Sequence, residues 1–371
     1  MNITTFFLPV FKHVSFFYIA FSLIISCNRE SQLNNHKTNS RPKTQKEFSV
    51  ETPAMDEVFS SNNPVTFTLH SDNQIIPDSV KIYLEGKFIH TEKTSALNFV
   101  LENVFSKVGR QNFRIIVFYN DSLSQTLTTR VTALSDKEPA TLSYRLIRKI
   151  PHDSGDYTQG LIYYNNWIYQ GTGRPGSSTL KKINPKNGTV ELERKMDKDI
   201  FGEGITILDH KIFQLTYRHK VGFVYDIASF ELLREFDLQT MEGWGLTTDG
   251  KNLIASDGSS VLYFYDPEYF NQIKQLDVCH NRGLVTNLNE LEYVDGAIWA
   301  NVYGESYILK IDAETGAVIA RLELESLFPK DIPRDYDHVL NGIAYNPSSH
   351  TFFITGKYWP LMYEIEILET E

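Results

Sequence analysis

The chain has 371 residues, enough for two or three domains with sizeable cores. Its 46 acidic residues outnumber its 36 lysines and arginines, and the resulting net charge of −10 argues against a broad nucleic-acid-binding surface. Aromatic residues make up 13% of the chain and favour β-rich structure. The two cysteines, Cys27 and Cys279, are too few for a disulfide scaffold, a four-cysteine zinc site or an iron–sulfur cluster.

The N-terminus has the features of a targeting segment. An apolar run at 14–25 follows a basic pair and is too short for a comfortable membrane span. It ends in Ser26 and Cys27, which resembles a bacterial lipobox. We therefore expect 1–26 to be a lipoprotein signal peptide and Cys27 to carry a lipid, with an ordinary signal peptide or a short uncleaved anchor as alternatives. This predicts a location in the bacterial cell envelope, periplasmic or surface-exposed, with a lipid anchor as the only membrane contact.

The next segments differ sharply in composition. Residues 27–47 are mostly polar and contain no aromatic residue, so they are predicted to be a flexible tether. In 48–135, about six short strands at regular spacing predict a small antiparallel, immunoglobulin-like β-sandwich. Chemistry-bearing residue types do not cluster there, which favours a spacer or interaction module. The charged, proline-containing stretch 135–140 is the expected domain boundary.

The remainder, 141–371, is a repeat of four-strand units, and this repeat decides the predicted fold. The copies begin at Gly160, Gly204, Gly245, Glu290 and Gly342. Steps of 41 to 52 residues with four strands each are typical of β-propeller blades. The last copy lacks a fourth strand, whereas 142–150 is a strand without a partner. We expect this strand to complete the last blade and close a five-bladed, all-β ring.

The predicted fold gathers polar and aromatic side chains at one end of the central channel. The first strand of each blade lines the channel, so the residue before each copy lies at this mouth. These residues are Gln159, Glu203, Trp244, Asn289 and Asn341. Residues that follow second strands are expected near the same end. They are Tyr217, Tyr303 and Lys357, with Trp359 in the same segment as the lysine.

Glu203 is the candidate proton-transfer group. Partial desolvation among aromatic rings would raise the pKa of its carboxyl toward neutrality, where it can both accept and donate a proton. Lys357 and Asn289 can stabilise a developing oxyanion, and aromatic walls suit a small, weakly polar group. The alternative is a structural Glu203 bonded to neighbouring backbone amides. The ten histidines show no metal-ligand spacing, so neither a protein-built metal site nor a cofactor is expected.

Eight short motifs follow one another in order between residues 144 and 367. They occupy 157–160, 201–204, 222–226, 243–246, 288–293, 299–301, 340–343 and 355–360. This series resembles the glutaminyl-peptide cyclotransferases of the plant and bacterial type, although the sandwich and the tether lie outside the resemblance. The resemblance implies a five-bladed propeller with acyltransferase activity, which converts the N-terminal glutamine of peptides to pyroglutamate, releases ammonia and needs no zinc.

The resemblance also implies roles for individual residues. Glu203 matches the general acid/base of the family. Pocket positions of the family are matched by Gln159, Trp244, Asn289 and Lys357. The chain departs from the family at Tyr217 and Tyr303, where tryptophan is usual, which puts its substrate preference in question.

The predicted function is metal-independent cyclisation of N-terminal glutamine in peptides or proteins by a monomer. Two other functions stay open at this point. One is a non-catalytic binding propeller anchored at the cell surface. The other is a calcium-dependent, lactonase-like propeller, for which only Glu203 and Glu290 could supply acidic ligands at the channel.

Overall fold

The computed structural model describes residues 46–93 and 96–368. The predicted signal peptide, the lipidation site Cys27 and nearly all of the predicted tether lie outside the described residues. Within the described ranges no helix has the length and apolar character needed to cross a bilayer. The structure there is all-β apart from one short 3-10 helix, Glu325–Leu327.

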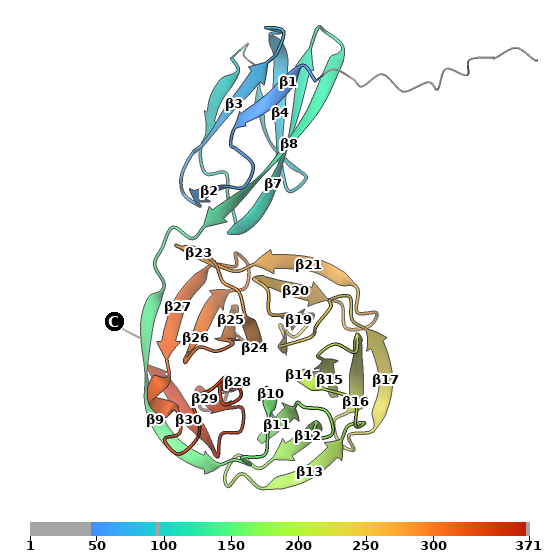
Figure 1. Ribbon diagram of the computed structural model, residues 1–371, viewed down its shortest axis with the longest axis vertical. Coiled ribbons are helices and arrows are strands. Elements are labelled where there is room, and N and C mark those ends of the chain that lie inside the picture. The colour runs from blue at the N-terminus through green and yellow to red at the C-terminus, as the bar shows by residue number, and fades with distance from the viewer. Residues whose placement is uncertain (1–45, 94–95, 369–371) are drawn as a thin grey trace, which may run out of the picture. The chain divides into compact units, whose positions relative to one another are not determined.

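The first eight strands form two sheets (Figure 1). They are β1 (Phe48–Thr52), β2 (Glu57–Ser60), β3 (Val65–Ser71), β4 (Pro77–Leu84), β5 (Lys87–Glu92), β6 (Asn98–Leu101), β7 (Gly109–Tyr119) and β8 (Leu123–Leu134). The sheet orders are β1–β3–β6 and β2–β8–β7–β4–β5. Alternate side chains of β3, β4 and β7 are buried, and their apolar members, such as Phe67, Ile82 and Phe113, share one core. β2 runs parallel to β8, so the predicted purely antiparallel arrangement is wrong at this edge.

Three four-stranded antiparallel sheets follow in chain order. The first contains β10 (Thr158–Tyr164), β11 (Trp167–Thr172), β12 (Thr179–Ile183) and β13 (Val190–Lys195). The second contains β14 (Gly202–Leu208), β15 (Lys211–Thr216), β16 (Val221–Asp226) and β17 (Leu232–Asp237). The third contains β18 (Leu246–Thr248), β19 (Leu253–Ala255), β20 (Val261–Tyr265) and β21 (Gln272–Asp277), and a hairpin of β22 (Cys279–His280) and β23 (Gly283–Leu284) comes after it.

The last strands belong to one eight-stranded sheet, in which β9 (Ala140–Pro151) is the link. On one side of β9 lie β24 (Leu288–Val294), β25 (Ala297–Val302), β26 (Tyr307–Asp312) and β27 (Val318–Glu323), and on the other lie β28 (Leu340–Asn346), β29 (Thr351–Gly356) and β30 (Leu361–Leu368). β9 pairs antiparallel with β30, from Pro151 opposite Leu361 to Ser143 opposite Leu368, as the repeat predicts. It also pairs in parallel with β27 through Ala140, a contact that the repeat does not predict.

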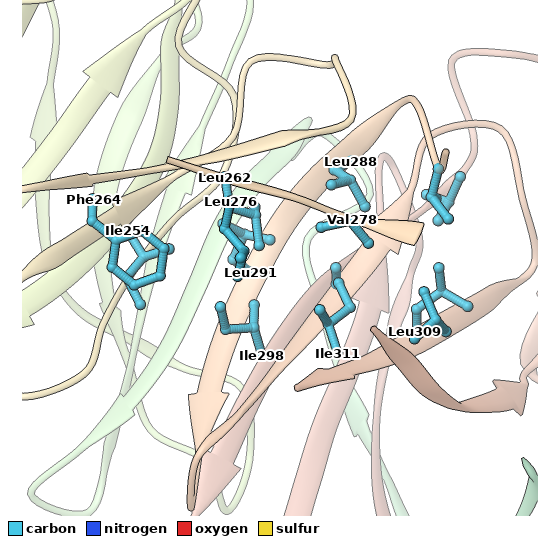
Figure 2. Packing of buried hydrophobic residues seen from close by; sticks show 14 residues of the cluster. Ile254, Leu262, Phe264, Leu276, Val278, Leu288, Leu291, Ile298, Leu309 and Ile311 are labelled. Atoms are coloured by element: carbon cyan, nitrogen blue, oxygen red, sulfur yellow. The ribbon is translucent and has the colours of Figure 1, made fainter. Parts of the chain in front are cut away.

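These sheets are arranged in a ring, with the first strand of each four-strand unit nearest the centre (Figure 1). Every residue of the inner strand β14 is buried, whereas most positions of the outer strand β17 are exposed. Apolar cores fill the spaces between neighbouring sheets. In one of them, residues of β19 and β20 such as Ile254 and Leu262 share a cluster with Leu291 and Ile298 of β24 and β25 (Figure 2). Packing between neighbouring sheets therefore holds the inner strands in place.

Candidate active site

Irregularities in the inner strands carry four of the predicted site residues. The register of β10 against β11 shifts at Gln159. Corresponding shifts occur at Glu203 in β14, Asn289 in β24 and Asn341 in β28. Such bulges re-aim a side chain and are over-represented next to active sites. In a regular strand, successive side chains would alternate between the two faces of the sheet, and the bulges interrupt this alternation at these four residues.

Glycines let the inner strands approach closely beside the site. A Cβ atom on Gly204 would lie 2.5 Å from the carbonyl oxygen of Trp244, and a Cβ atom on Gly245 would lie 1.9 Å from that of Asn289. The amide of Gly204 donates a hydrogen bond of 2.7 Å to the Trp244 carbonyl. The missing side chains therefore allow the segment that carries Glu203 to lie directly against the next inner strand.

Gln159 connects the candidate acid to the lysine. Its Nε2 donates to Glu203 Oε1 at 2.8 Å, and its Oε1 accepts a hydrogen bond from Lys357 Nζ at 2.6 Å. The three residues are only 2–3% exposed. Because a carboxamide donates at one end and accepts at the other, Gln159 can hold a carboxyl group and an ammonium group in place at the same time.

Burial shifts the pKa values of both titratable groups that Gln159 connects, Glu203 and Lys357. It raises the pKa of Glu203 well above its ordinary value, with the positive charge of Lys357 opposing the shift and the carboxylate of Glu242 adding to it. Burial also lowers the pKa of Lys357 to about 8, and here the charge of Glu203 opposes the shift. A raised carboxyl pKa and a lowered ammonium pKa favour proton exchange with a substrate.

Aromatic rings surround the lysine. The Lys357 Nζ lies 4.4 Å from the ring centroid of Tyr157 and 5.0 Å from that of Tyr303. The ring of Tyr303 in turn meets the ring of Trp244 edge to face, with centroids 5.8 Å apart. Tyr157 was not among the predicted site residues, although it opens the motif at 157–160, because nothing in an uncharged residue two positions before Gln159 distinguishes it from a packing residue. These rings shape an apolar wall around a cation.

The other predicted tyrosine, Tyr217, forms a second part of the wall. Its ring centroid lies 5.4 Å from that of Phe201 and 4.7 Å from the guanidinium of Arg218. Burial raises the pKa of Tyr217, and the charge of Glu242 and a hydrogen bond to it contribute to the shift. Glu242 was also missed at the level of sequence, where its only signal is its place two residues before Trp244.

The two predicted asparagines have buried acceptors. Asn341 Nδ2 donates to the carbonyl oxygen of Thr158 at 2.9 Å and to Gln159 Oε1 at 3.3 Å. Its Oδ1, like Oδ1 of Asn289, is buried and has no hydrogen-bond partner among the described residues. The side chain of Asn341 therefore bonds directly to Gln159. Asn289 contacts the site through its backbone carbonyl, which lies against Gly245.

Trp359 is packed in the core beside the turn that carries Lys357. It is 1% exposed, packs edge to face against Phe328 with centroids 5.5 Å apart, and donates from Nε1 to the carbonyl oxygen of His338 at 3.1 Å. The indole also covers Gly356, where an added Cβ would lie 2.3 Å from the ring. Trp359 thus holds the turn that carries Lys357, and its contact with substrate stays a prediction.

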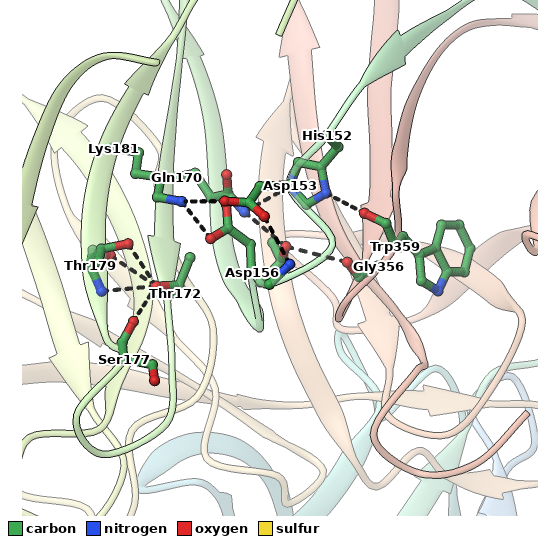
Figure 3. Close-up of polar contacts among 12 residues, drawn as sticks. His152, Asp153, Asp156, Gln170, Thr172, Ser177, Thr179, Lys181, Gly356 and Trp359 are labelled. Carbon is green, nitrogen blue, oxygen red and sulfur yellow. Dashed lines mark hydrogen bonds and ion pairs between the residues drawn. The ribbon is translucent and has the colours of Figure 1, made fainter. Parts of the chain in front are cut away.

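A buried polar network fastens the segment before β10 to the turn after β29 (Figure 3). Lys181 Nζ lies 2.5 Å from Asp156 Oδ1, and both side chains are buried. The carbonyl oxygen of Asp156 accepts a hydrogen bond of 2.8 Å from the amide of Tyr358. The hydroxyl of Thr158 donates to the carbonyl oxygen of Gly356 at 3.3 Å. The network therefore joins the segment that carries Gln159 to the segment that carries Lys357.

Glu290, the other acidic residue considered for a calcium site, is bonded to backbone. Its Oε1 accepts from the amide of Leu161 at 3.0 Å and its Oε2 from the amide of Ile343 at 2.8 Å. Burial raises the pKa of Glu290 well above its ordinary value. No group of three or more histidine, cysteine, aspartate or glutamate side chains that could hold a metal occurs in the part of the chain described. Glu290 acts as a brace between β24 and the inner strands β10 and β28.

Comparison with known proteins identifies the family of the chain. A sequence model of the glutamine cyclotransferase family matches residues 119–367. The chain belongs to the glutamine cyclotransferase family. It is similar to a glutaminyl-peptide cyclotransferase of Arabidopsis thaliana, with 37% identity over 235 residues that cover 61% of this chain and 73% of the relative. It is also similar to the crystal structure of Myxococcus xanthus glutaminyl cyclase, with a TM-score of 0.59, 29% identity, and coverage of 63% of this chain and 100% of the other. The predicted family is confirmed, and the protein is an enzyme of the acyltransferase type.

Proposed function

We propose that this protein converts the N-terminal glutamine of peptides or proteins to pyroglutamate with release of ammonia, without a metal ion. The observation that carries the proposal is the buried series in which Gln159 bridges Glu203 and Lys357 at 2.8 and 2.6 Å. Membership of the glutamine cyclotransferase family supports the substrate. The series supplies a carboxyl group with a raised pKa for proton transfer and a cation for charge that develops on oxygen.

The reaction is an intramolecular acyl transfer. The α-amine of the substrate attacks the carbonyl carbon of its own side chain, so a carbon–nitrogen bond forms while the carbon–oxygen double bond opens to an oxyanion. Glu203 takes a proton from the amine and delivers it to the carboxamide nitrogen, which leaves as ammonia when the carbonyl re-forms. Because amine and carbonyl are already tethered, the enzyme mainly has to hold the folded conformer and move the proton.

Other side chains act on binding and charge. Lys357 or Asn289 stabilises the oxyanion of the tetrahedral intermediate. The rings of Trp244, Tyr217 and Tyr303 exclude water and favour the uncharged amine, since desolvation disfavours an ammonium group. Gln159 and Asn341 hold the polar end of the substrate.

The proposal extends to the organisation of the chain. Residues 141–371 form a five-bladed propeller whose last blade is completed by β9, as the pairing of β9 with β30 supports. Residues 48–135 form an immunoglobulin-like module without a catalytic role. After removal of residues 1–26, a lipid on Cys27 anchors the monomer in the cell envelope through the tether at 27–47.

Mass spectrometry of peptides tests the function. The purified protein is incubated with two peptides that differ only in an N-terminal glutamine or glutamate. The expected result is a loss of about 17 daltons, the mass of ammonia, from the glutamine peptide alone. Only the glutamine side chain has a carboxamide nitrogen that can leave as ammonia when the tethered amine attacks. The rate should be unchanged by a strong chelator. An unmodified glutamine peptide would contradict the proposal and favour a binding module, and loss of activity with chelator would contradict metal independence.

A further inference from the structure

We propose that Glu242 is a positioning residue for this reaction, which orients the wall formed by Trp244 and Tyr217 and keeps a second negative charge beside Glu203. The inference rests on the proposed function. It concerns a residue that neither the repeat nor the family resemblance singles out.

The backbone places Glu242 between two parts of the site. The amide of the next residue, Gly243, donates to the carbonyl oxygen of Tyr217 at 3.1 Å. The carbonyl oxygen of Trp244 accepts from the amide of Gly204 at 2.7 Å, and Gly204 directly follows the catalytic glutamate. The segment is thus fixed on both sides, which places Glu242 between Tyr217 and Trp244.

The carboxylate of Glu242 holds several side chains at once. Its Oε2 accepts a hydrogen bond from the indole Nε1 of Trp244 at 3.0 Å, and its Oε1 accepts one from Arg218 Nε at 2.7 Å. Arg218, held in this way, lies over the ring of Tyr217, with its guanidinium 4.7 Å from the ring centroid. A carboxylate has enough acceptor sites for both donors, and charge-assisted hydrogen bonds are among the stronger ones. Glu242 therefore sets the orientation of two aromatic residues that face the substrate.

The charge of Glu242 also acts on the catalytic acid. It raises the pKa of Glu203 in addition to the larger effect of burial, because two carboxylates repel each other when both are ionised. Arg218 pairs with Glu242, but its side chain is 68% exposed, so solvent screens much of its charge. Removing the negative charge should lower the pKa of Glu203 toward its ordinary value.

The variant Glu242→Gln tests both effects. An amide keeps one acceptor but no charge, so we expect KM for a glutamine-headed peptide to rise about 10-fold, in line with the loss of a charged hydrogen bond. The acidic limb of the kcat profile should move to lower pH. The variant Glu242→Asp keeps the charge on a shorter side chain, so its KM should rise while its acidic limb stays in place. Glu138→Gln, which removes an exposed carboxylate from an ion pair with Arg282, is the matched control and should change neither quantity.

The outcomes separate this inference from the proposed function. If the wild-type protein releases no ammonia from glutamine-headed peptides, the proposed function fails before any variant is measured. If the wild type is active, a KM within about 2-fold of wild type together with an unmoved acidic limb in Glu242→Gln would overturn the role of Glu242. Should Glu242→Gln not fold, a wild-type KM in Glu242→Asp would overturn it as well.

Discussion

Glu203 and Lys357 illustrate how one buried glutamine can serve two opposite charges. Loss of hydration shifts both groups toward neutrality, since it raises the pKa of the carboxyl and lowers that of the ammonium. Gln159 lies between them and bonds to each, so that neither has to pair directly with the other. The substrate can then meet a carboxyl group that exchanges its proton and a lysine that is still charged below about pH 8.

The pH dependence of kcat tests the role of the lysine. Lys357 is protonated below its pKa of about 8 and loses its charge as pH rises through that value, so kcat should fall on the basic side with a limb near pH 8. In Lys357→Met, kcat should fall about 10²- to 10³-fold, as for the loss of an oxyanion donor, and the basic limb should vanish. The measurement is ammonia release at saturating peptide across the titration range. A basic limb that persists in Lys357→Met would contradict the assignment.

Strand positions were predictable where the hydrophobic pattern and the repeat determine them. The starts of the inner strands, and the pairing of β9 with β30, follow from local periodicity and from a missing fourth strand. The direction of a side chain that follows a strand cannot be predicted in this way, because contacts from distant segments determine it. Trp359 is two positions from Lys357, and only the packing of Phe328 and the bond to His338 show that it turns into the core.

The network in Figure 3 was beyond sequence analysis for the same reason, since it joins the start of β10 to the turn after β29. Its buried ion pair makes a stability prediction. Lys181→Met leaves the Asp156 carboxylate buried without its partner, which should lower the free energy of unfolding by about 3–5 kcal/mol. The double variant with Asp156→Asn should recover part of this loss, because no unpaired charge remains. Urea unfolding of the two single variants and the double variant measures the effect, and strict additivity would argue against a coupled pair.

At the scale of the whole molecule, we propose that catalysis belongs to the ring of sheets. The Myxococcus xanthus structure is matched along its full length by 63% of this chain, which indicates that the remaining strands are an addition to the enzyme fold. β9 precedes the other strands of the ring in the chain. It pairs with β30, the last strand, and with β27, so the strands at the two ends of the ring stabilise each other. This pairing covers the edge of β30 that would be exposed without β9.

Two shortened chains test this organisation. A chain that begins at residue 136 keeps β9 and should retain kcat/KM within about 3-fold of the full protein, a change below 1 kcal/mol. A chain that begins at residue 152 lacks β9, exposes the edge of β30 and should aggregate or unfold at a lower temperature. Size-exclusion chromatography and thermal unfolding report the second effect. A folded but inactive chain from residue 136 would show that the sandwich contributes to the site.

The most direct test of the account is the turnover of Glu203→Gln. This substitution keeps the shape of the side chain and removes the carboxyl group that we propose transfers the proton. Ammonia release from a glutamine-headed peptide should fall about 10²-fold or more, as expected for the loss of general acid–base catalysis, while circular dichroism shows an intact fold. Turnover equal to that of the wild-type protein would contradict the central role of Glu203.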